Sequence, residues 1–167
     1  MKNFEIIKIK NPKVTDNLIQ LLYKKLINFD VDQNILHIEK RYGRKFSAQQ
    51  ILEILLEQDF VFLATDGEDI FGYADLKEDK NTGELKGGYF VFPNNLRAGI
   101  GTELLLILIK TSQDESKILR VEVEETNIPS IMLVQKVSEL IKPTIIKTNT
   151  TYNPPTKIFY WNPTFKV

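Results

Sequence analysis

The sequence contains no cysteine and a single histidine, His37. Without cysteine there is no disulfide and no thiol nucleophile, and one histidine cannot supply the usual zinc ligand sets, so we expect no metal site. No apolar run reaches the roughly 18 residues that a membrane-spanning helix needs. A Ser-His-Asp triad would have to use His37, but no Gly-x-Ser-x-Gly motif accompanies it. We therefore expect His37 at a helix end or on the surface.

The chain also lacks an excess of charge of either sign. Lys plus Arg and Asp plus Glu each number 22, so neither nucleic acid nor a membrane is an expected partner. The first residues carry charge throughout and contain no signal-peptide core, and with the missing cysteines this favours the cytoplasm. A length of 167 residues and a hydrophobic content of 43% predict one domain over residues 1–167, which buries roughly 70% of the surface of the unfolded chain.

The stretch from Gly87 to Lys110 organises the rest of the chain. It predicts a strand, a glycine-bearing loop and a buried helix, over residues 89–92, 94–101 and 103–110. The strand is aromatic and β-branched, and Pro93 ends it. Glu103 and Lys110 stand where they would complement the helix macrodipole.

Such a loop in front of a helix can bind a phosphate group. The first backbone N–H groups of a helix have no partner inside it, and glycines let the backbone approach a bulky anion. The alternative is a helix that merely begins after a glycine turn. A P-loop motif is absent, and Leu104 stands where a dinucleotide fingerprint needs its third glycine.

The remaining elements follow from periodicity and capping residues. Before the central stretch we expect a strand at 4–9, a helix capped by Thr15-Asp16 with Leu18, Ile19, Leu22 and Leu26 inward, a helix with a Ser47/Gln50 capping box, and strands at 60–64 and 70–76 joined through Asp66-Gly67. Residues 28–46 are polar and irregular, with a basic cluster at Lys40, Arg41, Arg44 and Lys45 that we interpret as solvated surface. Gly87 and Gly88 suggest a bulge or a close approach by another backbone.

After the central helix, a strand at 118–126 has one apolar and one acidic face. A helix then begins at Asn127 with Pro129 in its first turn. Its expected core face consists of Ile131, Met132, Val134, Val137 and Leu140. A hairpin of residues 145–152 and 157–161 around Pro154-Pro155 completes the chain.

The central stretch resembles the general N-acetyltransferase (GNAT) superfamily. In that family a strand ending Val-x-Pro-x-x leads into Gln/Arg-x-x-Gly-x-Gly/Ala and a helix. Val91-Phe92-Pro93-Asn94-Asn95 and Leu96-Arg97-Ala98-Gly99-Ile100-Gly101 keep that register, except that Leu96 replaces the usual Gln or Arg. The resemblance implies an α/β (α+β) fold, a mixed and mostly antiparallel central sheet with helices on both faces, in the order β-α-α-β-β-β-α-β-α-β-β.

The resemblance also implies which residues would contact acetyl-CoA as the co-substrate. The family's splayed strand offers its backbone to the pantetheine arm, its loop holds the pyrophosphate, and an Asn opens the next helix. These positions are Tyr89, Phe90 and Val91 for the arm, Arg97, Ala98, Gly99, Ile100, Gly101 and Thr102 for the pyrophosphate, and Asn127 for the helix.

Two positions bear on catalysis. Glu122 stands where some members of the family place a general base, which would take the proton of the attacking amine; the alternative is a solvated glutamate on an exposed strand face. Val134 stands where the family usually has a tyrosine as the acid for the thiolate. Tyr152 and Tyr160 are interpreted as packing residues of the hairpin.

The resemblance implies an N-acetyltransferase that moves the acetyl group from acetyl-CoA to a primary amine in one direct step. The acceptor would be a small molecule or a peptide, chosen by variable segments such as residues 28–46. The alternative is a non-catalytic acyl-CoA-binding or protein-interaction module with a degenerate GNAT fold, which Leu96 and Val134 keep open. The oligomeric state, monomer or homodimer, is also open.

Overall fold

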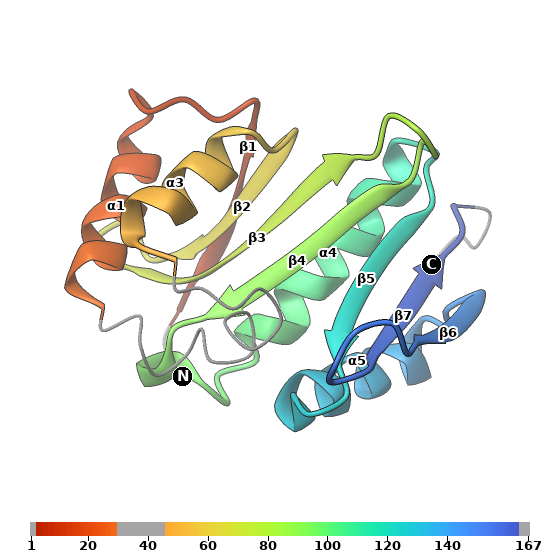
Figure 1. Cartoon of the computed structure of the whole chain (residues 1–167). Coiled ribbons are helices and arrows are strands. Elements are labelled where there is room, and N and C mark those ends of the chain that lie inside the picture. Colours follow the sequence, from red (N-terminus) through yellow and green to blue (C-terminus); the bar gives the residue numbers. More distant parts are fainter. Residues whose placement is uncertain (1–2, 30–45, 164–167) are drawn as a thin grey trace.

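The protein is built on one seven-stranded sheet, in the order β1-β2-β3-β4-β5-β7-β6 (Figure 1). The computed structural model describes residues 3–29 and 46–163. All neighbouring strands are antiparallel except β4 and β5, which run parallel. The strands are β1 (Glu5–Lys10), β2 (Phe60–Thr65), β3 (Ile70–Glu78), β4 (Leu85–Val91), β5 (Leu119–Glu124), β6 (Ile145–Asn149) and β7 (Thr156–Trp161).

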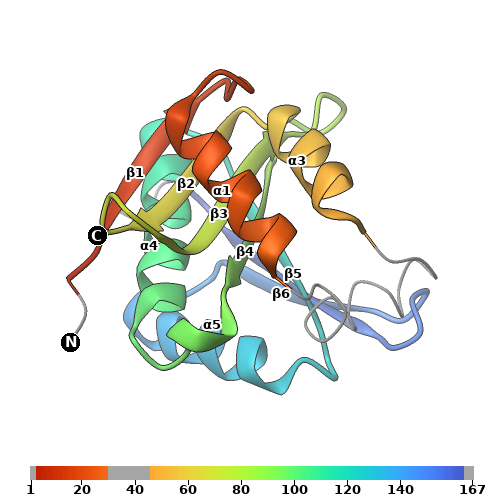
Figure 2. The same ribbon diagram turned by 90° about the vertical axis from the view of Figure 1, so that its left-hand side faces the viewer.

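Helices cover both faces of this sheet (Figures 1 and 2). One face carries α1 (Asn17–Asn28) and α3 (Ala48–Leu56), and the other carries α4 (Ile100–Asp114) and α5 (Ile128–Leu140). A short 3-10 turn, η2 (Pro93–Asn95), lies between β4 and α4. The predicted fold class and the predicted order of the elements are therefore confirmed.

Two apolar clusters make up the core, one on each face of the sheet. Ile19, Leu22 and Leu26 of α1 pack with the inward residues of α3 against Val61 and Leu63 of β2. On the other face, Leu104 and Leu108 of α4 lie among the alternate residues of β2, β3, β4 and β5. Because β2 is covered on both faces, all six of its residues are buried, as its apolar sequence requires.

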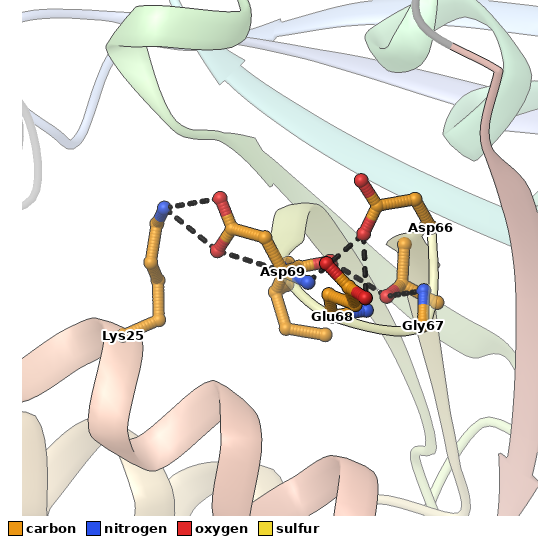
Figure 3. Close-up of polar contacts among 7 residues, drawn as sticks. Lys25, Asp66, Gly67, Glu68 and Asp69 are labelled. Carbon is orange, nitrogen blue, oxygen red and sulfur yellow. Dashed lines mark hydrogen bonds and ion pairs between the residues drawn. The ribbon is translucent and has the colours of Figure 1, made fainter.

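The turn between β2 and β3 ties α1 to the sheet (Figure 3). The side chain of Asp66 accepts hydrogen bonds from the backbone N–H groups of Glu68 and Asp69, and Gly67 has a φ of 93°. The Nζ of Lys25 on α1 lies 2.8 Å from each carboxylate oxygen of Asp69. The predicted turn at Asp66-Gly67 is thus confirmed, and it extends over four residues rather than two.

Two details of the predicted helices need correction. The helix α4 begins at Ile100 and continues past Lys110 to Asp114, because the polar residues Thr111 and Ser112 are buried and the Ser112 hydroxyl donates to the backbone oxygen of Ile109. Asp16 is the N-cap residue of α1, but its carboxylate accepts from the N–H of Lys13 and caps no helical N–H. The capping box of Ser47 and Gln50 is present as predicted.

The predicted core face of α5 is partly wrong. Ile131, Val134 and Val137 are buried, whereas Met132 and Leu140 are 64% and 69% exposed. A helix turns by about 100° per residue, so Met132 and Leu140 lie off the stripe that the three buried residues form.

The glycine pair in β4 forms no bulge. The register between β3 and β4 is regular from Glu78↔Leu85 to Gly72↔Val91. A Cβ on Gly87 would lie 3.1 Å from side-chain carbons of Leu76 and Leu119. Core side chains, rather than another backbone, therefore explain the glycine at this position. The basic cluster at residues 40–45 and His37 lie outside the described residues.

Candidate active site

The strands β4 and β5 separate in the middle of the sheet (Figure 1). They pair only through Leu85, Lys86 and Gly87 of β4, which lie opposite Leu119, Arg120 and Val121. From Gly88 onward the described residues offer β4 no partner on this side. The parallel ladder therefore opens into a gap that points toward the loop before α4.

The backbone of two residues of β4 faces this gap. The N–H of Phe92 donates to the oxygen of Phe71 on β3, and successive residues of a strand direct their backbone groups to opposite neighbours. Phe90 therefore faces β3, while Tyr89 and Val91 direct their N–H and C=O groups into the gap. Of the three residues predicted to bind a pantetheine arm, Tyr89 and Val91 have the suitable orientation and Phe90 does not.

The loop before α4 presents a row of backbone donors. Within residues 3–29 and 46–163, the N–H groups from Arg97 to Thr102 meet no acceptor, whereas the N–H of Glu103 already donates to the oxygen of Gly99. Arg97 and Gly99 have positive φ angles of 65° and 84°. Such alternation turns consecutive N–H groups toward one point, which is the geometry of an anion site. A left-handed conformation at a non-glycine residue such as Arg97 is the kind of strain that occurs at functional sites.

The two glycines of the loop have different environments. A Cβ on Gly99 would meet nothing within 4 Å, so this residue borders open space. A Cβ on Gly101 would lie 2.5 Å from Cδ1 of Leu133 on α5. A side chain at Gly101 would therefore enter the contact between α4 and α5. The N–H of Gly101 still belongs to the row of donors.

The first turn of α5 borders the loop before α4 and the gap between β4 and β5. Asn127 is the N-cap of α5, and its side-chain oxygen accepts from the N–H of Ser130. The hydroxyl of Tyr89 donates to the backbone oxygen of Ser130 at 3.5 Å. Burial raises the pKa of Tyr89 to about 12, and the hydrogen bond to Ser130 opposes this in part, so the phenol stays protonated at neutral pH. Tyr89 thereby links β4 to the first turn of α5.

Glu122 occupies the α1/α3 face of β5, and it is not a solvated side chain. Its side chain is 22% exposed, and its Oε1 lies 2.6 Å from the Nη2 of Arg120. Arg120 also lies 3.9 Å from a carboxylate oxygen of Glu84 and faces the ring of Tyr160. The structure therefore places the predicted base in an ionic network.

Val134, at the family's acid position, and the two C-terminal tyrosines lie in different surroundings. Val134 is fully buried in the core and carries no acid. Tyr160 lies opposite Arg120 on β7, on the same face as Glu122. Tyr152 is 37% exposed in the turn before β7.

One acidic residue near the gap was missed from the sequence. Asp75 lies on β3 directly opposite Gly88, and burial raises the pKa of its carboxyl to about 7. The signal in the sequence was an acidic residue within an otherwise apolar strand, Ile70-Phe71-Gly72-Tyr73-Ala74-Asp75-Leu76. This pattern alone does not reveal that Asp75 lies opposite Gly88 of β4 or that the gap between β4 and β5 begins there.

Other features of the described residues lie apart from this gap. A groove of about 560 Å³ runs along the β1 side of α4, between Phe4 and Ile6 on one wall and Leu106 and Ile107 on the other, and it reaches the loop at Gly99. The described residues hold no group of three or more His, Cys, Asp or Glu side chains placed to bind a metal ion. No helix among them is long and apolar enough to cross a membrane.

The parallel pair of β4 and β5 thus opens in front of a loop of unpaired backbone donors at the N-terminus of α4. The sequence model of the acetyltransferase (GNAT) family matches residues 25–138. That range covers more than half of the chain, and the chain belongs to this family of acyltransferases.

Solved structures agree with this assignment at the level of the fold. An N-acetyltransferase from Staphylococcus aureus Mu50 has a TM-score of 0.68 at 17% identity, over 97% of this chain and 99% of the other. The N-acetyltransferase PseH from Campylobacter jejuni, in complex with acetyl coenzyme A, has a TM-score of 0.58 at 18% identity, over 95% and 99%. An acetyltransferase of the GNAT family from Streptococcus pneumoniae has a TM-score of 0.59 at 15% identity, over 96% and 99%. A search of curated protein sequences found no match.

Proposed function

We propose that this protein is an N-acetyltransferase that transfers the acetyl group of acetyl-CoA to a primary amine by direct attack. The observation that carries the proposal is the row of backbone donors from Arg97 to Thr102 beside the gap between β4 and β5. A diphosphate needs several converging donors, and a pantetheine arm, which carries amide groups, needs a strand edge with open N–H and C=O groups.

The candidate binding residues would hold acetyl-CoA in one consistent orientation. The N–H groups of the loop and the positive charge of Arg97 would hold the pyrophosphate at the N-terminus of α4. Val91 and then Tyr89 lie successively deeper along the gap, so their backbone would pair with the arm as a missing strand does. Asn127 fixes the start of α5 at the opposite wall. Bound in this way, acetyl-CoA would present its thioester near Gly88, where β4 and β5 part.

The exposed Leu96 agrees with a backbone-based site. Its side chain is 60% exposed, and its position in the family motif usually carries Gln or Arg. Because the donors are main-chain N–H groups, the loss of one polar side chain would lower the affinity without removing the site.

In the family register, Glu122 is one candidate for the proton acceptor. Its carboxylate lies on the face where an amine could approach, but Arg120 already occupies one of its oxygens. Replacement of Glu122 by Gln should lower the rate by about 10²–10⁴ if this carboxylate takes the proton. A rate close to that of the wild type would leave Glu122 as a partner of Arg120 alone.

A matched pair of glycine substitutions tests the anion site. Gly99→Asp should weaken CoA binding at least tenfold, because it places a negative charge in the open space beside the donors, and Gly99→Asn should weaken it much less, because it has the same shape and also tolerates positive φ. Gly67→Asp is the control: Gly67 has a φ of 93° with nothing within 4 Å, and it lies in the turn between β2 and β3. Calorimetry that gives equal CoA affinities for Gly99→Asp and Gly67→Asp would remove the pyrophosphate from this loop.

A non-catalytic acyl-CoA-binding module is the second candidate. The buried Val134, where the family has an acid, favours it. Release of free thiol from acetyl-CoA in the presence of a panel of amines separates the two functions, because the module would bind CoA without releasing thiol.

A further inference from the structure

Asp75 lies where β4 and β5 begin to separate. It pairs with Gly88, the residue that follows the last one joined to β5. A Cβ on Gly88 would lie 3.3 Å from Oδ1 of Asp75, so the carboxylate extends over the glycine on the α1/α3 face. A side chain at residue 88 would fill the space beside the carboxylate that an incoming group needs.

No structural partner accounts for this carboxylate. Within the described part of the chain, Asp75 makes no hydrogen bond and no ion pair, and its side chain is partly buried. A partly buried acid without a partner in the protein lowers stability when it ionises. A role in holding the fold therefore does not explain an acid in the middle of β3, and its pKa of about 7 suits proton transfer at neutral pH.

The surroundings of Asp75 differ from those of Glu122. The inward residues of α1 and α3 are apolar. Next to Asp75 on the same face lie the aromatic rings of Tyr73 and Phe90, whose centroids are 5.5 Å apart. Aromatic faces attract cations, so an ammonium group beside Asp75 would meet both a carboxylate and two rings. Glu122, in contrast, is bound by Arg120 at 2.6 Å.

Given the proposed function, on which this inference rests, we propose that Asp75, rather than Glu122, is the general base that receives the ammonium group of the acceptor and takes its proton. The neutral amine then attacks the acetyl carbon, a C–N bond forms, and the C–S bond breaks. After the attack the nitrogen loses a second proton, which neutralises the thiolate of the departing CoA. Asp75 then releases the proton that it took to solvent. Glu122 holds Arg120 in place.

The charged and titratable groups on the same face of the neighbouring strands define the electrostatic setting. Those that the structure describes are Tyr73 and Lys77 on β3, Lys86 on β4, and Arg120, Glu122 and Glu124 on β5. Burial and the charge of Asp75 raise the pKa of Tyr73, so this phenol stays neutral. Lys77 is paired with Glu57 and Lys86 with Asp79. None of these cations is bound to Asp75, which leaves its carboxylate available to an ammonium ion.

The test compares Asp75→Asn with Glu122→Gln. The probes are acetyl-CoA and three primary amines: phenethylamine, spermidine and a tetrapeptide with a free N-terminus. With the best of these amines, Asp75→Asn should lower kcat by about 10²–10⁴ and leave the Kd for CoA unchanged. Glu122→Gln should lower kcat less. Asp79→Asn, in the turn between β3 and β4, is the control and should keep the activity of the wild type.

Two further measurements separate catalysis from structure. The kcat of the wild type should rise with pH through about 7, because the base must be ionised, and Asp75→Asn should lack this rise. Asp75→Glu keeps the carboxylate and should therefore recover part of the rate that Asp75→Asn loses. A purely structural role of Asp75 would not require this recovery.

Each result decides between the proposals. A larger loss in Glu122→Gln than in Asp75→Asn would return the base to Glu122, and normal rates in both would show that neither carboxylate takes the proton. In both cases CoA binding and turnover by the wild type would still support an acetyltransferase. If the wild type binds CoA but acetylates none of the amines, or binds no CoA, the proposed function fails and this inference fails with it.

Discussion

The partly buried carboxyl of Asp75 should make the stability of the fold depend on pH in a direction that can be measured. Its pKa is raised from the ordinary 3.8 to about 7 in the folded protein, because burial disfavours the ionised form. The folded state therefore holds this proton more tightly than the unfolded chain does. The stability that results is complete below pH 4 and is lost as the pH rises from about 4 to about 7.

The size of the effect follows from the difference between the two pKa values. One pH unit corresponds to about 1.4 kcal/mol, so the difference between 3.8 and about 7 gives about 4 kcal/mol. Because the side chain retains some contact with solvent, we expect about 2–4 kcal/mol. Asp75→Asn removes the titration and keeps the shape of the side chain. The variant should match the wild type near pH 4 and exceed its stability by this amount at pH 8.

Urea unfolding at a series of pH values provides the measurement. Trp161, the single tryptophan of the chain, is buried and reports the transition by its fluorescence. Asp79→Asn is a control of opposite sign: Lys86 lies 2.7 Å from Asp79 and lowers the pKa of its carboxyl. That contribution is present at neutral pH and is lost as the pH falls. A constant difference between Asp75→Asn and the wild type from pH 4 to pH 8 would refute the reasoning.

Three further outcomes follow from the packing. Gly101→Ala should destabilise the fold by about 1–3 kcal/mol in urea unfolding, and Leu133→Ala should relieve part of this cost because Leu133 is the side chain in the way; additive effects would contradict this. Val134→Tyr should destabilise by about 1–3 kcal/mol or more without raising kcat, because Val134 is fully buried. Lys25→Ala should cost less than about 1 kcal/mol, since Lys25 and Asp69 are partly exposed, and a larger loss in thermal or urea unfolding would contradict this.

The sequence was sufficient for most of the fold because its local signals agree with one another. Ser47 and Gln50 form the expected capping box, and Pro129 lies in the first turn of α5. The errors arose where side-chain neighbours decide the outcome. Met132 and Leu140 are apolar, and only the rotation of α5 on the sheet shows that they face outward. Gly87 is required by core side chains from other elements, which the sequence does not place.

The candidate site was predictable only along the stretch that carries the family motif. Arg97 to Thr102 could be named because their donors belong to one continuous loop. The role of Asp75 could not be predicted, because its meaning depends on Gly88 in the next strand and on the separation of β5 from β4. The ion pair of Glu122 joins two alternate residues of β5, Arg120 and Glu122, which the alternation of the strand allowed but did not require.

The short junction between β4 and β5 divides the sheet into two mechanical units. Three residue pairs join them, against seven between β3 and β4 and six between β5 and β7. The block β1-β2-β3-β4 and the block β5-β7-β6 are therefore joined by few main-chain hydrogen bonds and by the side chains of α4 that pack against both. A ligand that spans the gap would act as a brace, and amide hydrogen exchange should slow in β5 and β7 as well as in β4 when CoA is bound.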